Sequence, residues 1–239
     1  MNKDFYKDNP DYDFLKTNKY LGSNIGYLTL AGSHAQGLNT KDSDIDVRGF
    51  FFENVRDLLS VNIPPKEQVE DRTTDTVVFS FRKFIKLCLN GNPSCLELLG
   101  TRDEDVLFMS PEAAWLRDNY KLFLSKNIYN PFKGFAGHLR KVYFGEKAKG
   151  NIAKANKTLM HCLRILYTGR DLFSKQELIV YRPEREFLLD VRSGNYSEEP
   201  LENPLLLDFL TTAKEEFELA YKTTDLPDEP DYKTVDYLQ

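Results

Sequence analysis

The sequence predicts an α/β (α+β) protein with a mostly helical C-terminal region. In residues 1–109, short apolar and β-branched runs alternate with helical patterns, as expected for strands and helices in turn. After Ser110 the patterns are almost all helical, with apolar residues at spacings of three and four. We therefore expect two domains, residues 1–109 and 110–239.

Three segments of the first half are predicted to be strands. Residues 25–31 form a nearly continuous apolar run, which is typical of a buried strand. Residues 44–52 begin with alternating polar and apolar residues, as in a strand with one wet face. Residues 75–80 are rich in β-branched side chains, and the charged segment 66–74 before them is expected to be exposed.

Helices are expected between and after these strands. Residues 54–61 suit a short helix, and the apolar positions of 81–89 predict a helix on the core. The turn at 90–93 contains Gly and Pro, which separate that helix from a short one at 94–99.

The second half begins with Ser110 and Pro111, a helix cap and a first-turn proline. Segment 178–181 is expected to be extended. The acidic tail after Thr223 contains two prolines, and we expect it to be mobile or to lie along the surface. Helices are expected at 111–126, 131–147, 151–169, 183–191 and 204–222.

Composition excludes several classes of protein. The 239 residues contain 32 Lys+Arg and 37 Asp+Glu, a net charge of −5, so bulk charge does not hold nucleic acid. No apolar run is long enough for a membrane span, and the polar N-terminal segment is unlike a secretory signal. Cys88, Cys95 and Cys162 lie in apolar stretches without zinc spacing, which predicts buried free thiols and a cytoplasmic location.

One segment carries residues suited to chemistry. Asp44 and Asp46 are two apart on an expected strand, so both side chains would lie on one face, about 7 Å apart at their Cα atoms. Two carboxylates so placed repel each other unless a cation lies between them. Mg²⁺ (or Mn²⁺) prefers such oxygen ligands together with phosphates. Asp75 opens the next strand and supplies a third carboxylate.

Gly32 and Ser33 end the strand that precedes the two aspartates. Glycine permits close backbone approach to a ligand, and the Ser33 hydroxyl and neighbouring N–H groups suit phosphate oxygens. No Gly-Lys-Ser/Thr sequence of a P-loop is present. A solvated turn explains either feature alone, whereas their combination indicates a metal–polyphosphate site.

This pattern resembles the DNA polymerase β-like nucleotidyltransferase superfamily, whose hallmark is Gly-Ser, about ten residues, then Asp-x-Asp; here His34 to Ser43 are the ten. The resemblance extends over about residues 25–195. It is closest to a subfamily of predicted nucleotidyltransferases that includes proteins linked to RNA ligases in proposed RNA repair. The supporting segments are Asp44–Phe51, Asp75–Leu87, Asn90–Leu99, Lys157–Gly169 and Leu188–Gly194.

The resemblance implies a mixed sheet flanked by helices and a Mg²⁺ site of Asp44, Asp46 and a third acid. We take Asp75 as the third, with Asp71, Glu70 and Glu97 as alternatives. The implied reaction transfers a nucleoside monophosphate from an NTP such as ATP to a hydroxyl of an RNA end or a protein, releasing pyrophosphate. Asp44 and Asp46 would hold the metal, Gly32 and Ser33 the phosphates, and Asp75 would activate the hydroxyl.

Further cations are candidate contacts. Lys83, near Arg82 and Lys86, is a candidate for phosphate although a solvated helix face suits it too, and His34 follows Ser33 directly. His161 and Arg164 are three apart on an expected helix and could face the nucleotide. A basic strip on the middle helices suits RNA or a plain solvated surface; it comprises Lys133, His138, Arg140, Lys141, Lys147, Lys149, Lys154 and Lys157.

Two alternatives stay open. A non-catalytic or antitoxin-like nucleotide-binding protein of the same fold would be expected to lose part of the carboxylate set. An antibiotic-modifying transferase would need an acidic cleft for a drug, for which the sequence gives no sign. No membrane partner is expected, and the motifs do not specify an oligomeric state.

Overall fold

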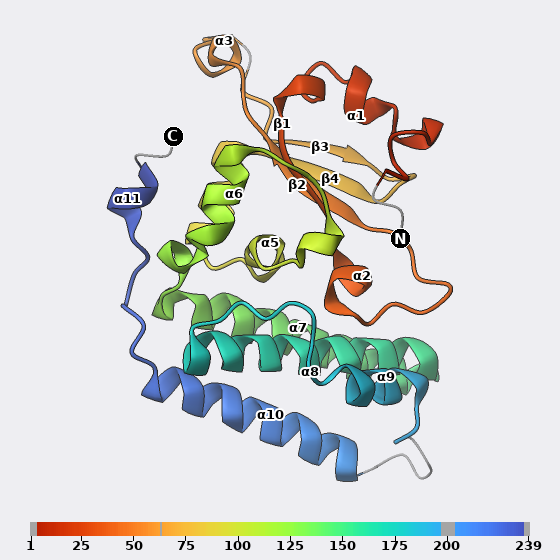
Figure 1. Cartoon of the computed structure of the whole chain (residues 1–239). Helices are drawn as coiled ribbons and strands as arrows, with labels where there is room; N and C mark the ends of the chain where they lie inside the picture. The colour runs from red at the N-terminus through yellow and green to blue at the C-terminus, as the bar shows by residue number, and fades with distance from the viewer. Residues whose placement is uncertain (1–3, 63, 197–203, 237–239) are drawn as a thin grey trace.

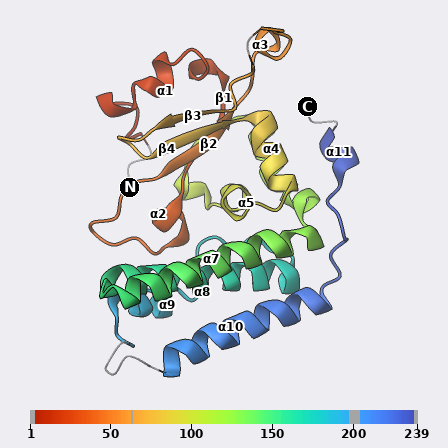
Figure 2. The same ribbon diagram turned by 180° about the vertical axis from the view of Figure 1, so that it is seen from behind.

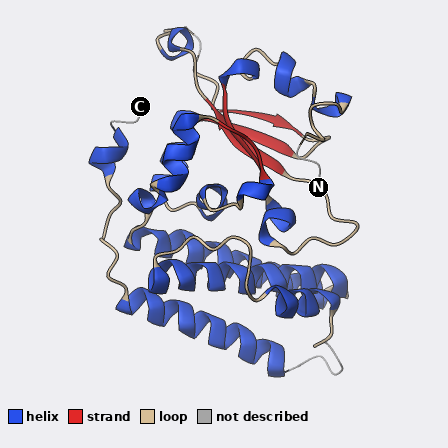
Figure 3. Cartoon of the chain, in the orientation of Figure 1, coloured by secondary structure: helices blue, strands red, loops and turns tan. Residues whose placement is uncertain are grey.

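The computed structural model describes residues 4–62, 64–196 and 204–236. A five-stranded mixed sheet in the order β3-β4-β2-β1-β5 occupies one half of the molecule. Long helices form a layer in the other half, with α2 and α5 between the two (Figures 1 and 3). The predicted α/β (α+β) class with a mostly helical C-terminal region is therefore confirmed.

The strands differ from prediction mainly at their ends. β1 (Ile25–Leu30) and β4 (Thr76–Ser80) agree with it, whereas β2 (Val47–Phe51) begins after the two aspartates rather than at residue 44. β3 (Gln68–Asp71) lies in the segment predicted to be only exposed, because it is an edge strand whose charged side chains stay in water. β5 (Val106–Met109) was not predicted.

Strand directions place the important residues at one end of the sheet. β2 runs parallel to β4, with Val47 opposite Thr76, so the residues just before these strands are neighbours. β1 runs antiparallel to β2, with Leu30 opposite Val47. The Ala31 amide extends this ladder by donating to the Asp46 carbonyl at 2.9 Å. The end of β1 and the starts of β2 and β4 therefore meet.

Short helices surround the sheet. α4 (Phe81–Leu89) agrees with prediction and α5 (Pro93–Leu99) begins one residue early. The expected helix 111–126 is wrong: α6 ends at Asp118, and two 3-10 turns follow. The other short elements are α1 (Phe14–Thr17), α2 (Gly32–Gln36), α3 (Val55–Leu58), α6 (Pro111–Asp118), and the 3-10 turns Pro10–Tyr12, Gly22–Asn24, Asp103–Asp105, Tyr120–Phe123 and Lys126–Ile128.

The helical layer contains α7 (Tyr129–Ala148), α8 (Ile152–Lys175), α9 (Arg185–Ser193) and α10 (Pro204–Thr223). α8 passes beyond Gly169, which was predicted to end it. A Cβ at Gly169 would lie 2.5 Å from Cε2 of Phe217, so this glycine serves close packing of α8 on α10 rather than termination. Segment 178–181 forms no strand.

The described part of the tail, to residue 236, runs along the protein from the end of α10, and whether it is mobile stays a prediction (Figure 1). Leu226 is buried, and so is Val235 in α11 (Tyr232–Asp236). The Lys126 amide donates to the Pro227 carbonyl at 2.8 Å. The last three residues of the expected tail, 237–239, lie outside the described part of the chain.

Two cores hold the fold together. The larger joins both halves: Tyr27 and Phe50 of the sheet share it with Leu159 and Phe217 of the helical layer. Figure 2 shows α4 and α5 between the sheet and α7. The smaller core lies under α1, around Leu15 and Phe51. The division into 1–109 and 110–239 stays a prediction.

All three cysteines are buried and free, as predicted. Burial raises the pKa of Cys95 and of Cys162 to about 12, and raises that of Cys88 as well. These thiols are therefore protonated and inert at neutral pH. Among the described helices, none combines the length and the apolar character needed to cross a membrane.

Candidate functional site

Three chain segments meet where β1 ends and where β2 and β4 begin. α2 starts at Gly32, directly after β1, with a left-handed φ of +54°. A Cβ at this position would lie less than 3.0 Å from Oδ2 of Asp46. Glycine is therefore required here both for the backbone conformation and for the close approach of the carboxylate.

Arg48 joins two of the predicted acids. Its Nη2 donates to Oδ1 of Asp46 at 3.2 Å and to Oδ1 of Asp75 at 2.9 Å. Its Nη1 donates to the Asp75 carbonyl. Arg48 lies two residues after Asp46, so the i, i+2 spacing could have indicated this pairing, yet sequence reasoning missed Arg48.

The three aspartates form an electrostatic cluster. Burial raises the pKa of Asp46 from its usual 3.8 to about 6; Arg48 opposes this, and the neighbouring Asp75 and Asp44 carboxylates add to it. Asp44 and Asp75 are more exposed than Asp46. The predicted repulsion among neighbouring carboxylates is thus present, although Asp44 and Asp46 precede β2 instead of lying on it.

The alternatives for the third acid lie elsewhere. Oδ1 of Asp71 accepts hydrogen bonds from the amide and hydroxyl of Thr74, at 2.8 and 3.0 Å, in the turn between β3 and β4. Glu70 accepts from Gln68 on β3. Glu97 is buried in α5, where Arg164 pairs with it. Of these acids, Asp75 is the one that shares Arg48 with Asp46.

A cavity of about 190 Å³ opens beside this cluster. Gly32, Asp46 and Arg48 line one part of it, and Gln36, Glu97 and Arg164 line another. Its other lining residues are mostly apolar or aromatic: Ala31, Ala35, Phe79, Ser94, Leu98, Thr101, Phe135 and Val180. The predicted residue Arg164 is therefore brought to the site. Gln36 was missed, and nothing in its sequence context distinguishes it.

The remaining predicted residues are placed differently. Lys83 does not line this cavity: its Nζ lies 3.1 Å from Oε2 of Glu67 and 2.6 Å from Oε1 of Gln68, at another hollow. His161 is also outside the lining. Ser33 is half-buried in the first turn of α2, and Nε2 of His34 lies 3.5 Å from the Ser43 carbonyl oxygen.

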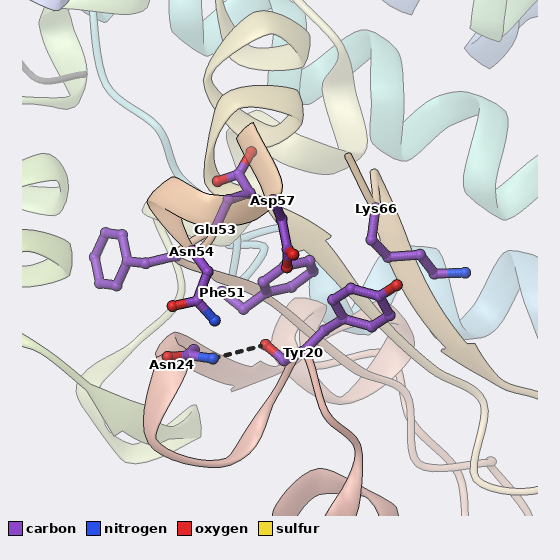
Figure 4. A pocket seen from close by; sticks show the side chains of 8 residues that line it. Tyr20, Asn24, Phe51, Glu53, Asn54, Asp57 and Lys66 are labelled. Carbon is purple, nitrogen blue, oxygen red and sulfur yellow. Dashed lines mark hydrogen bonds between the residues drawn. The ribbon is translucent and has the colours of Figure 1, made fainter. Parts of the chain in front are cut away.

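A smaller hollow lies near Tyr20, Asn24, Asp57 and Lys66, and its lining includes none of Asp44, Asp46 and Asp75 (Figure 4). Its volume of about 10 Å³ suits a single water molecule rather than a nucleotide. The basic strip is mostly exposed, and three of its lysines are paired: Lys149 and Lys154 with Glu146, and Lys133 with Glu218.

The donor chemistry of the aspartates fits Mg²⁺ or Mn²⁺, which prefer carboxylate oxygens. Among the described residues, no three His, Cys, Asp or Glu side chains are arranged as a metal-holding group. Between Asp46 and Asp75 the positive charge is supplied by Arg48 instead. Arg48 therefore occupies one carboxylate oxygen of each of these two acids, for which a metal ion would compete.

The chain was compared with family models, with curated proteins and with solved structures, and the match to a family model agrees with the motif. A family model described as the RNA repair pathway DNA polymerase beta family matches residues 12–239. An uncharacterized 38.9 kDa protein of Enterobacteria phage T4 is 30% identical over 123 residues, which cover 46% of this chain and 35% of the phage protein. A nucleotidyltransferase-like protein from Exiguobacterium sibiricum covers 83% of this chain and 69% of its own, at 14% identity and a TM-score of 0.30.

Proposed function

The chain belongs to the RNA repair pathway DNA polymerase beta family, and on that premise we propose that it is a metal-dependent nucleotidyltransferase. It transfers a nucleoside monophosphate from an NTP to a hydroxyl and releases pyrophosphate. The observation that carries the proposal is that Gly32, Asp46 and Arg48 line one cavity while Arg48 links Asp46 to Asp75.

Each residue has a role that follows from its position. Asp46, Asp44 and Asp75 would hold Mg²⁺ or Mn²⁺, which when bound neutralises phosphate charge and acidifies the acceptor hydroxyl. Gly32 would let the triphosphate approach the backbone. The hydroxyl of Ser33, the next residue of α2, would donate a hydrogen bond to a phosphate oxygen. Arg48 attracts the phosphates once the aspartates are occupied.

The bond changes balance without further reactants. The acceptor oxygen attacks the α-phosphorus, the bond from that phosphorus to the pyrophosphate oxygen breaks, and the hydroxyl proton passes to a carboxylate. Asp75 is exposed and suits that last role, because a general base must reach the incoming hydroxyl. The name of the family favours an RNA end as the acceptor over a protein hydroxyl.

The test is transfer of label from each α-labelled NTP to RNA with Mg²⁺ or Mn²⁺. Asp46→Asn and Asp75→Asn keep side-chain size and should each reduce transfer at least ~100-fold, the usual scale for one catalytic group. Asp71→Asn, at the end of β3, is the matched control and should retain transfer. Full transfer in Asp46→Asn would overturn the proposal. Nucleotide binding without transfer in the wild type would favour the non-catalytic alternative.

A further inference from the structure

The cavity has two chemically different parts. Asp46 and Arg48 make one part charged, and the aspartate cluster adds negative charge around it. In the other part the charge of Arg164 is matched by Glu97, and Gln36 is neutral. This second part therefore has no net charge to attract a phosphate.

The orientation of the Gln36 amide is fixed. Its Nε2 donates to Oε2 of Glu97 at 3.2 Å, and a carboxylate only accepts hydrogen bonds. The acceptor atom, Oε1, must therefore be on the other side of the amide. Gln36 is 5% exposed, and its Oε1 has no hydrogen-bond partner among the described residues.

Arg164 supplies a hydrogen-bond donor, whereas Gln36 supplies an acceptor. Its Nη1 donates to Oε1 of Glu97, and the side chain is buried. Its Nε is likewise without a partner in the described part of the chain. Glu97 thus fixes both neighbours, leaving one buried acceptor on Gln36 and one buried donor on Arg164. Leaving such groups unpaired is costly, so a ligand that satisfies them both is favoured.

The surrounding walls suit a flat ring. Phe79 and Phe135 are half-buried and line the same cavity, together with Leu98 and Val180. Aromatic faces stack on heterocycles of any identity, while fixed donors and acceptors distinguish one from another. The volume of about 190 Å³ is below the ~300–1,000 Å³ of whole-ligand pockets, so it takes part of a molecule.

We propose that Gln36 and Arg164, held by Glu97, recognise the base of the incoming nucleotide. Gln36 Oε1 accepts from an N–H of the base, and Arg164 Nε donates to an adjacent ring nitrogen or carbonyl. This inference rests on the proposed nucleotidyltransferase function, since it requires the phosphates to lie toward Asp46. It assigns base selection to two side chains, one from α2 and one from α8, that both contact Glu97.

The test separates the base from the phosphates. The four NTPs and base-free tripolyphosphate are titrated with Mg²⁺ by calorimetry, and the four ribonucleosides by ligand-observed NMR. The proteins are wild type, Gln36→Met and Gln68→Met. Gln68 is half-buried on β3 and does not line this cavity, so the same substitution there is the matched control. Arg164→Lys is a second variant that keeps the positive charge beside Glu97, and thermal melting checks folding.

The wild type should prefer one base, and Gln36→Met should reduce that preference about tenfold or more, the usual effect of leaving one buried partner unpaired. Arg164→Lys should act in the same direction. Tripolyphosphate affinity should stay within about twofold, and Gln68→Met should match the wild type. Equal affinity for all four bases, or equal loss of NTP and tripolyphosphate binding in Gln36→Met, would overturn the inference.

The two proposals fail separately. Asp46→Asn should abolish transfer and leave nucleoside binding in place. If transfer survives in Asp46→Asn while Gln36→Met still loses base preference, the catalytic proposal fails and the base pocket stands. If transfer depends on Asp46 but base preference is unchanged in Gln36→Met, base selection lies elsewhere.

Discussion

The carboxylate of Asp46 lies against the main chain of Gly32, so close that no side chain fits between them. The two residues come from the segments after β1 and before β2, which the sheet brings together. This contact links the Gly-Ser and Asp-x-Asp parts of the motif into one structural unit. The effects on stability of substituting Gly32 and Asp46 should therefore depend on each other.

Gly32→Ala is expected to destabilise the protein and to displace Asp46. The left-handed φ costs alanine about 1–2 kcal/mol, and the clash with the carboxylate adds to it. In an Asp46→Ala background the clash is relieved, so the same substitution should cost only the backbone part. Urea denaturation of the two single variants and the double variant measures this coupling.

Gly134→Ala is the matched control for the double-mutant cycle of Gly32→Ala and Asp46→Ala. Gly134 lies within α7, and a Cβ there meets nothing within 4 Å. Alanine should stabilise the helix by about 0.5–1 kcal/mol. Additive costs of Gly32→Ala and Asp46→Ala would contradict the contact described here.

Arg48 is expected to compete with metal for the aspartates. Its guanidinium holds Asp46 and Asp75 together without a metal, so Arg48→Met should lower stability in EDTA by leaving carboxylates unpaired. The same loss of positive charge should raise the affinity of the cluster for Mn²⁺. Thermal melting with and without Mn²⁺ measures both effects, and the metal-induced rise in melting temperature should be larger in Arg48→Met.

Arg48→Lys keeps the positive charge and serves as the control for this comparison. Its metal-induced rise in melting temperature should lie between that of the wild type and that of Arg48→Met. A smaller metal-induced rise in Arg48→Met than in the wild type would show that Arg48 does not compete with the cation.

Local patterns predicted the centre of the site but not its surroundings. Gly32, Asp46 and Asp75 each follow or precede a strand that hydrophobic patterning locates, so their meeting was predictable once the strands were aligned. Glu97 was also predicted, as an alternative third acid. Its pairing with Arg164 depends on the packing of α5 against α8, which no local pattern encodes.

The errors in the predicted helices and strands also arise from contacts that no local pattern encodes. Gly169 suggested a helix end because glycine has low helix propensity, but packing against Phe217 outweighs that cost. β3 was missed because its charged residues indicate exposure, which an edge strand satisfies. Lys83 is a different case: its role as a phosphate contact stays a prediction, and the structure places it beside Glu67 and Gln68 at another hollow.

His161 is expected to lower stability in acid. Burial lowers its pKa from 6.5 to about 3, with Arg164, Lys157 and Arg192 adding to the effect. Between these two pH values the unfolded chain binds a proton that the folded protein does not. The stability that the neutral His161 contributes is therefore complete above pH 6.5 and is lost as the pH falls toward 3.

Comparison with His161→Gln isolates this contribution. Asp46 acts in the opposite direction, since its pKa is raised to about 6 and its proton favours the folded state below that pH. The difference in free energy of unfolding between wild type and His161→Gln cancels that effect. It should grow as the pH rises from 4 to 7, measured by urea denaturation at each pH. A difference independent of pH would show that His161 has the same pKa in the folded and the unfolded protein.

Arg182 and Asp171 are expected to show the largest stability effects in the helical half. Both side chains are fully buried, and Nη2 of Arg182 donates to Oδ2 of Asp171 at 2.7 Å. Arg182→Met removes the fully buried partner of Asp171, which then retains the more exposed Arg170 and Lys175, so it should cost about 1.5–3 kcal/mol of unfolding free energy. Asp171→Leu should cost a similar amount, because Arg182 then retains only Glu184 as an acidic partner among the described residues.

The double variant Arg182→Met with Asp171→Leu should cost clearly less than the sum of the two single variants, because neither charge is then left unmatched within the pair. Urea denaturation measures all three, with Lys175→Met as control: Lys175 also pairs with Asp171, at 3.2 Å, but its side chain is 49% exposed, so its loss should cost less than about 1 kcal/mol. Because the Arg182 amide donates to the Gln36 carbonyl at 3.1 Å, this pair also anchors the segment that holds α2 at the cavity. Arg182→Met should therefore weaken NTP binding more than Lys175→Met does. Equal costs for Arg182→Met and Lys175→Met would show that burial of the Arg182–Asp171 pair does not control the stability of this half.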